Sequence, residues 1–349
     1  MLPRPVVVSF RGAVLAALCA LLPWSGFAAT PPATPSAPAP AASARFTFAA
    51  VGCMPYGRLP GSQEGFARVI AEINRHRPAF SVHLGDIFGG EEDATDALYL
   101  KRRAEFDTFS TALVYTPGDN EWTDAHRSGH EPQERLAFLR RTFFADERSR
   151  GAQPLDLVTQ RRDPAFAAYV ENARWSRGGV IFATLHLVGS ANNHQPKFPG
   201  AVEEWRAREA ANVAWLRAVF AEATRTAAPG VAFFFQANAV SANGGPTHDP
   251  GFTAVLAALE TEARAFGKPV LLVHADEHRY RLEPGIRLRR DADPVPNVTR
   301  LETFGAGDFH AVLVTVDPAS PRVFLAGPLL VPGNPLPTIP APAPPAKKM

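Results

Sequence analysis

The chain has 349 residues, of which 46% are apolar, 20% are charged and 10% are aromatic. This composition supports a large buried core and excludes a wholly disordered or collagen-like chain. The 36 basic and 34 acidic residues leave a formal charge of +2, and this near balance gives no indication of a nucleic-acid surface. The two cysteines, Cys19 and Cys53, are too few for a disulfide framework.

The first 29 residues have the pattern of a secretory signal peptide. A basic segment precedes an apolar run at 13–22, and small residues follow up to Ala29. The apolar run is short and is soon interrupted by Pro23, which argues against a membrane span. We therefore expect export to the periplasm or the medium, with no stable membrane anchor after cleavage near Ala29. A lipoprotein anchor at Cys19 and an uncleaved anchor are the alternatives.

Two further segments are dominated by Pro and Ala. Residues 30–44 and 332–349 have too few large apolar side chains to form a packed core. We therefore expect a signal peptide at 1–29, a linker at 30–44, one folded domain at 45–331 and a Pro-rich disordered tail at 332–349.

Apolar strands and amphipathic helices alternate along the domain. Strands are expected at 46–51, 80–84, 112–116, 231–235, 269–273 and 311–316, with a strand pair at 166–175 and 179–188. Helices are expected at 63–76, 94–109, 132–144, 201–223 and 252–266. This alternation predicts one α/β domain with a parallel sheet and additional strands late in the chain.

Polar side chains gather directly after five of these strands. They fall in five blocks, at Cys53, at Asp86, at 119–121, at 236–238 and at 274–278. Cys53 precedes Asp86 by 33 positions, and Asp86 precedes Asp119 by another 33, which is one strand–helix unit each time. Because the carboxyl ends of parallel strands open onto one edge of a sheet, we expect the blocks to meet. Their carboxylate, amide and imidazole groups suit hard or borderline divalent cations.

The order of these blocks resembles the calcineurin-like metallophosphatase superfamily, in a divergent, exported bacterial-type branch. The resemblance spans about 46–278 and rests on Gly85-Asp86, on 118–121 (GDNE) and on 272–278 (LVHADEH). It implies a four-layer α-β-β-α sandwich of two mixed sheets flanked by helices. It also implies two divalent metal ions, of the Mn, Fe or Zn class.

The resemblance assigns the metal ligands residue by residue. Asp86 matches the metal-bridging Asp of the family, and His278 matches the last His of its final block. Asp119 stands where the family has a ligand Asn, and Asp276 stands where it has a His. The implied ligand set is Cys53, Asp86, Asp119, Gln236, Asp276 and His278, with His274 bound directly or through another ligand.

The implied activity is hydrolysis of a small phosphorylated substrate, by attack of a metal-activated hydroxide on a phosphate ester. Asn120 replaces the family His that assists the transition state. Its amide can donate a hydrogen bond to a phosphoryl oxygen but cannot protonate a leaving group. His126 is therefore the candidate proton donor, with His194 as the alternative.

Cys53 replaces the first ligand Asp of the family. A thiolate binds zinc or iron but is a poor ligand for magnesium, calcium or manganese, so one metal position should be weakened or altered in preference. Cys53 has two other interpretations, a buried inert thiol or a nucleophile in a loop that ends at Arg58. With Asn120 and Gln236, it leaves open a second function, that of a weakly or non-catalytic protein that binds a ligand or another protein.

Overall fold

The computed structural model describes residues 44–240 and 249–337. The expected signal peptide, almost all of the expected linker and residues 338–349 lie outside this part of the chain. None of the helices in the described part combines the length and the apolar character that a membrane crossing requires.

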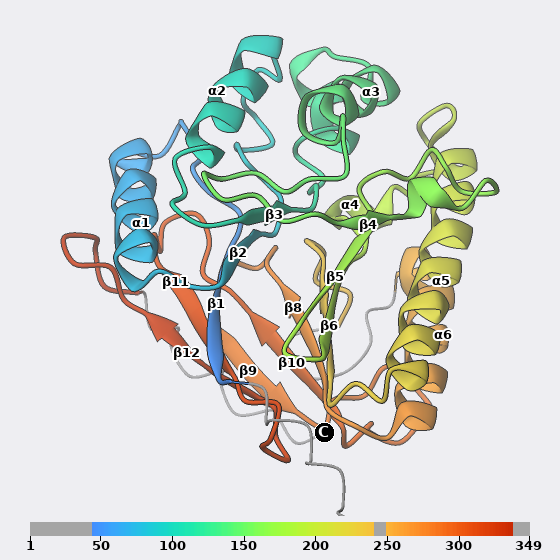
Figure 1. The fold of residues 1–349 in the computed structure, drawn as a ribbon. Coiled ribbons are helices and arrows are strands. Elements are labelled where there is room, and N and C mark those ends of the chain that lie inside the picture. The colour runs from blue at the N-terminus through green and yellow to red at the C-terminus, as the bar shows by residue number, and fades with distance from the viewer. Residues whose placement is uncertain (1–43, 241–248, 338–349) are drawn as a thin grey trace, which may run out of the picture. The chain divides into compact units, whose positions relative to one another are not determined.

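The strands form two mixed sheets, seen in Figure 1. The first sheet has the order β12-β11-β1-β2-β3. Strands β1, β2 and β3 are parallel to one another, and β11 is antiparallel to both of its neighbours, β1 and β12. Its strands are β1 (Phe46–Val51), β2 (Phe80–His83), β3 (Leu113–Tyr115), β11 (Ala311–Val316) and β12 (Phe324–Leu329).

The second sheet has the order β4-β5-β6-β7-β8-β10-β9, in which β6, β7, β8 and β10 are parallel. Its strands are β4 (Val158–Thr159), β5 (Ala173–Arg177), β6 (Val180–Thr184), β7 (Val231–Phe234), β8 (Val270–His274), β9 (Arg281–Pro284) and β10 (Val298–Glu302). The parallel strands explain the buried apolar runs of the sequence, because both of their faces are covered.

Three apolar cores hold four layers together. Alternation along β1 sends Phe48 and Ala50 into the core between the sheets, and Ala49 and Val51 into the core beneath the helices. The helices on the first sheet are α1 (Ser62–His76), α2 (Asp96–Phe106) and α3 (Pro132–Phe143). The helices on the second sheet are α5 (Ala201–Arg225) and α6 (Thr253–Phe266).

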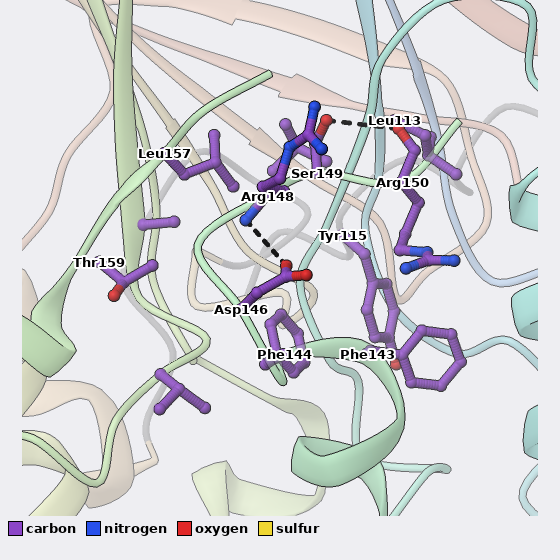
Figure 2. Close-up of a pocket in the computed structure, with 13 residues that line it drawn as sticks. Leu113, Tyr115, Phe143, Phe144, Asp146, Arg148, Ser149, Arg150, Leu157 and Thr159 are labelled. Carbon is purple, nitrogen blue, oxygen red and sulfur yellow. Dashed lines mark hydrogen bonds between the residues drawn. The ribbon is translucent and has the colours of Figure 1, made fainter. Parts of the chain in front are cut away.

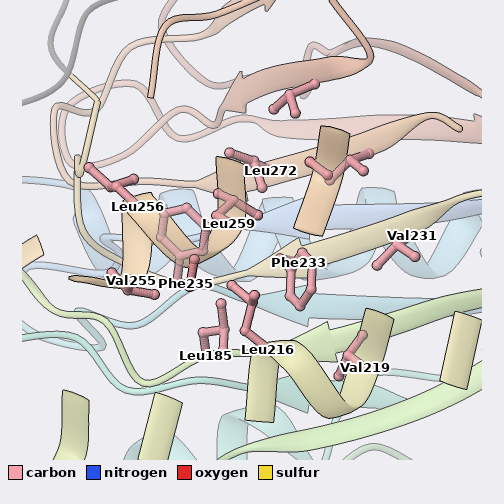
Figure 3. Packing of buried hydrophobic residues seen from close by; sticks show 14 of the residues in the cluster. Leu185, Leu216, Val219, Val231, Phe233, Phe235, Val255, Leu256, Leu259 and Leu272 are labelled. Atoms are coloured by element: carbon pink, nitrogen blue, oxygen red, sulfur yellow. The ribbon is translucent and has the colours of Figure 1, made fainter. Parts of the chain in front are cut away.

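Figure 3 shows the third core, between the second sheet and its helices. Leu216 of α5 and Leu259 of α6 pack toward Phe233 and Leu272 of the sheet. The predicted four-layer sandwich of two mixed sheets is therefore confirmed.

One predicted strand is wrong over most of its length. The strand expected at 166–175 begins only at Ala173, and the preceding residues form successive turns. Phe166 N–H donates to Asp163 O at 3.0 Å, and Tyr169 N–H donates to Phe166 O at 3.0 Å. The aromatic residues suggested a strand, but Asp163-Pro164 favours turn initiation and the turns continue from it.

The two sheets approach each other closely at the carboxyl ends of their parallel strands. A Cβ placed on Gly52, after β1, would lie 2.9 Å from the Cβ of Ala275, after β8. Cys53 N–H donates to Gly85 O at 2.9 Å, which also joins the loops after β1 and β2. Loops from both sheets therefore share one edge of the sandwich.

Candidate metal centre

Five of the predicted ligands converge at this shared edge. The ligand atoms of Cys53, Asp86 and His278 lie within 4.8 Å of one another, and those of Asp86, Asp119 and Asp276 do the same. We call these five residues the Asp86 cluster. Asp86 belongs to both groups, so the cluster consists of two adjoining half-sites that share one carboxylate.

Four of the five residues of the Asp86 cluster have a left-handed backbone conformation. The φ angles are 52° at Cys53, 54° at Asp86, 78° at Asp276 and 63° at His278. Each such residue is disfavoured by about 1–2 kcal/mol relative to ordinary backbone. Residues in sparsely populated backbone regions concentrate at functional sites, where surrounding structure holds them in place.

Two glycines let the carboxylates sit close to neighbouring backbone. A Cβ at Gly118 would lie 2.0 Å from Asp86 Oδ1, and a Cβ at Gly189 would lie 2.7 Å from Asp119 Oδ2. Real Cβ atoms do not approach so closely, so any side chain at either position would displace a carboxylate of the cluster.

Three hydrogen-bond donors meet at a single oxygen of Asp86. Oδ2 lies 3.0 Å from the hydroxyl of Tyr56, 3.1 Å from Nε2 of Gln236 and 3.5 Å from Sγ of Cys53. Oδ1 accepts from the backbone N–H of Asn120 at 3.3 Å. The donors around Oδ2 occupy directions from which a cation would also approach a shared carboxylate.

The second half-site is built from carboxylates. Asp119 Oδ2 accepts from the Ser190 hydroxyl at 2.8 Å. Asp276 accepts from Asn238 N–H at 2.8 Å and from Gln236 Nε2 at 3.0 Å. Backbone and amide donors thus orient the carboxylates, but none of these donors carries a full positive charge.

Three carboxylates of this edge, those of Asp86, Asp119 and Asp276, have no Lys or Arg partner among the described residues, whereas Asp124 pairs with Arg127 at 2.8 Å. Burial, followed by the charges of Asp119, Glu121 and Asp276, raises the pKa of Asp86 well above its usual range. Burial and the charge of Asp119 raise the pKa of Asp276 to about 7. Buried carboxylates without counter-charge are unfavourable as anions, and a bound cation would remove that penalty.

The donors of the cluster fit divalent cations, with a different preference in each half. Cys53, Asp86 and His278 offer sulfur, oxygen and nitrogen, a set suited to zinc or iron. Asp86, Asp119 and Asp276 offer oxygen alone, a set suited to manganese or magnesium. The shared carboxylate lets both positions be held together.

Two of the predicted ligands lie outside this donor set. His274 Nε2 accepts from Arg300 Nε at 2.7 Å, and its Nδ1–H donates to Ala275 O at 3.0 Å, so both ring nitrogens are engaged. Gln236 turns its amide nitrogen toward the carboxylates, while its Oε1 accepts from Gly189 N–H at 2.6 Å. His274 is the last residue of the buried strand β8. Gln236 donates hydrogen bonds to the carboxylates of Asp86 and Asp276 and so holds them together.

The predicted proton donors also lie apart from the Asp86 cluster. His126 Nδ1–H donates to Thr123 O at 2.8 Å, and its ring lies tilted against Phe198 with the centroids 4.3 Å apart, beside a cavity of about 420 Å³. The ring of His194 lies 4.4 Å from that of Trp205. Neither imidazole belongs to a ligand group of the described residues.

Asn120 has a different role from the one expected. Its Nδ2 donates to the hydroxyl of Tyr56 at 3.1 Å and to Phe88 O at 3.0 Å. Both amide hydrogens are therefore committed to the protein, and the side chain holds Tyr56 in place.

Three groups at this edge were not predicted from the sequence, namely Tyr56, Ser190 and Asp124. The Ser190 hydroxyl lies 2.8 Å from both Asp119 Oδ2 and Asp124 Oδ1. Ser190 belongs to α4 (Gly189–Asn192), where the backbone is left-handed from Ser190 to Asn193. Tyr56 and Asp124 could have been suspected, because each follows a predicted ligand by three or five positions.

A separate small cavity, shown in Figure 2, lies elsewhere in the molecule. It has a volume of about 20 Å³ and is lined by Leu113, Tyr115, Phe143 and Leu157 among others. This volume holds about one water molecule, so the cavity is not a substrate site.

Comparison with solved structures identifies the fold. The structure of PhoD superposes with a TM-score of 0.53 and 14% sequence identity, covering 80% of this chain and 66% of that one. A purple acid phosphatase from seeds of yellow lupin (Lupinus luteus) superposes with a TM-score of 0.51 and 11% identity, covering 84% of this chain. This chain spans only 53% of the lupin protein.

Comparisons of the sequence, in contrast, find no relative. No protein-family model matches the chain, and no curated protein sequence matches it. The chain nevertheless has the fold of the calcineurin-like metallophosphatases, as its motifs predicted.

Proposed function

We propose that the protein is a metal-dependent phosphoesterase that hydrolyses a phosphate ester of a small phosphorylated substrate. One observation carries the proposal, namely that Asp86 joins two groups of ligand atoms at the carboxyl edge of both sheets. Solved structures of the same fold include a purple acid phosphatase, which supports a phosphoryl substrate for this edge.

Each part of the cluster has a place in this activity. Cys53, Asp86 and His278 would hold one ion, and Asp86, Asp119 and Asp276 would hold the other. Two divalent ions at such a site supply an acidified water nucleophile and neutralise charge on the phosphoryl group. Gln236 keeps Asp86 and Asp276 in register, because its amide donates to both.

We also propose that the two positions take different metals. The first position would favour zinc or iron because of the Cys53 thiolate, and the second would favour manganese or magnesium. Export remains part of the proposal, since it rests on the signal-like pattern of residues 1–29.

The test is metal analysis combined with hydrolysis assays. The purified protein should retain stoichiometric divalent metal and hydrolyse p-nitrophenyl phosphate or bis-p-nitrophenyl phosphate. Asp86→Asn should lose metal and reduce turnover to the level of buffer, because it removes the carboxylate common to both half-sites. Asp156→Asn is the matched control, since that carboxylate is 95% exposed and belongs to neither group.

A second candidate function is phosphate-ligand binding without catalysis. It is favoured by Asn120, whose amide is fully engaged and cannot protonate a leaving group. A protein that binds metal and inorganic phosphate, but hydrolyses neither ester with any divalent ion, would support this candidate over the enzyme.

A further inference from the structure

Tyr56 is the protic group that reaches closest to the shared carboxylate of the cluster. Its hydroxyl lies 3.0 Å from Asp86 Oδ2 and 3.4 Å from His278 Nε2. The tyrosine ring meets the His278 imidazole edge to face, with the centroids 5.5 Å apart. Tyr56 is half-buried, as are Asp276 and His278, whereas Asp86 is 3% exposed, so the phenol lies on the more exposed side of the shared carboxylate.

The hydrogen-bond geometry of this phenol fixes the direction of its proton. Asn120 Nδ2 donates to the Tyr56 oxygen at 3.1 Å, which leaves the hydroxyl hydrogen to point toward Asp86 or His278. A tyrosine hydroxyl carries one hydrogen, so the phenol can donate one hydrogen bond from this position.

A cation in the first half-site would take away both acceptors of this hydrogen. Asp86 and His278 are candidate ligands, and a lone pair that binds a metal no longer accepts a hydrogen bond. A hydrogen-bond donor left without an acceptor is unfavourable. It would be satisfied by an oxygen atom of whatever anion binds beside the cation.

We infer that Tyr56 donates its hydroxyl hydrogen to a non-bridging oxygen of the bound phosphoryl group, with Asn120 holding the phenol in position. The inference rests on the proposed function, since it assumes a metal ion and a phosphoryl ligand at the Asp86 cluster. It replaces the earlier expectation that the Asn120 amide itself contacts the phosphoryl oxygen. Tyr56 thus recognises a tetrahedral oxyanion and takes no part in proton transfer.

The experiment compares Tyr56→Phe with wild type, using inorganic phosphate as the probe. The substitution removes only the hydroxyl and keeps the ring against His278. Calorimetric titration of the metal-loaded protein should show phosphate affinity weakened about tenfold or more, the usual effect of losing a hydrogen bond to a charged oxygen. The metal content of Tyr56→Phe, measured by mass spectrometry, should equal that of wild type.

Tyr169→Phe is the matched control for loss of a tyrosine hydroxyl. Its ring contacts Phe166 and Arg140 and lies outside both groups of ligand atoms. This variant should bind phosphate as wild type does.

A double-mutant cycle tests the role of Asn120. If the amide acts through the phenol, Asn120→Ala should weaken phosphate binding on its own and add little to Tyr56→Phe. Fully additive losses would overturn the positioning role.

Two results would overturn the inference about Tyr56. One is wild-type phosphate affinity in a correctly folded Tyr56→Phe. The other is loss of a metal ion in that variant, which would make the phenol a ligand. Failure of the proposed function is distinct, because a wild type that holds no metal refutes it directly. A wild type that binds metal and phosphate but hydrolyses no ester also refutes the proposed function. In that case the phosphate affinity of Tyr56→Phe still shows whether Tyr56 contacts the bound phosphate.

Discussion

Buried carboxylates occur in several parts of the molecule, and two of these places stabilise their carboxylates in opposite ways. In the first place, Glu171 is fully buried and lies 2.6 Å from both Arg140 Nη2 and His186 Nδ1. Burial alone would raise the pKa of Glu171, but Arg140 and His186 outweigh it and leave the pKa well below its usual range. The ion pairs therefore satisfy this carboxylate within the protein.

The Asp86 cluster is less completely buried, since Asp276 is half-buried, and it has the opposite electrostatics. Its carboxylates face one another and hydroxyl, thiol and amide donors, and the pKa values of Asp86 and Asp276 are raised. The charge of Glu171 is already offset by Arg140 and His186, whereas the charge of the Asp86 cluster has no such counter-charge and a bound cation could offset it. The contrast separates a carboxylate that is neutralised within the protein from carboxylates that could hold a metal ion.

The largest expected effect comes from neutralising one carboxylate in each place in metal-free protein. Glu171→Gln should lower the free energy of unfolding by about 3–5 kcal/mol, because it removes the charge that pairs with half-buried Arg140 and fully buried His186. Asp86→Asn should instead raise the free energy of unfolding by about 1 kcal/mol or more, because it relieves repulsion among buried carboxylates. Urea denaturation at pH 7.5 with a chelator measures both.

The comparison fails if both substitutions destabilise the metal-free protein equally. Asp156→Asn serves again as the control, since an exposed carboxylate should change the free energy of unfolding by less than about 0.5 kcal/mol.

A second effect concerns pH. The pKa of Asp276 is raised from 3.8 to about 7, so between these values the folded state binds more protons than the unfolded state. The contribution of Asp276 to stability is therefore lost as pH rises from about 4 to about 7. Buried His83 acts in the opposite sense, because burial lowers its pKa to about 3 and its folded form is penalised in acid.

Comparison of wild type with Asp276→Asn isolates the carboxylate from such histidines. The stability advantage of metal-free Asp276→Asn should grow from pH 4 to pH 7 and then level off. Saturating metal should abolish the trend, because metal binding keeps the carboxylate ionised. An advantage independent of pH in the metal-free protein would contradict the raised pKa.

The smallest expected effect is at Cys53. Its thiol touches Asp86 and accepts from Asp276 N–H at 3.2 Å, at the place where an aspartate would add an oxygen ligand. Cys53→Asp should strengthen manganese binding by about tenfold, since a carboxylate suits manganese better than a thiolate does. Cys53→Ser controls for loss of the thiol. Unchanged manganese affinity in a folded Cys53→Asp would show that position 53 is not a ligand position.

Much of the fold could be predicted because each strand and helix is indicated by the pattern of apolar residues within its own segment. The buried runs of β1, β2, β7 and β8 are unbroken, and the helices between them have a clear apolar face. The glycines that end β1 and β2 also marked Cys53 and Asp86 correctly as residues of the shared edge.

The parts that could not be predicted depend on contacts between distant loops. Ser190 reaches Asp119 across 71 positions, and no spacing rule in the sequence links them. His274 looked like a ligand because it adjoins Asp276, but its strand directs it toward Arg300, 26 positions later. Partner choice among buried polar groups is set by the packed fold, so the sequence located the five blocks and five members of the cluster but not the partners of Gln236 and His274.

The left-handed backbone of Cys53, Asp86, Asp276 and His278 has a consequence for engineering the protein. Glycine is the residue best suited to such angles, so a redesign guided only by thermal robustness would place glycine at all four positions. That variant would relieve backbone strain at four positions while losing every side chain but Asp119 from the cluster. Backbone conformation and the chemistry of the cluster therefore make opposite demands on these four residues.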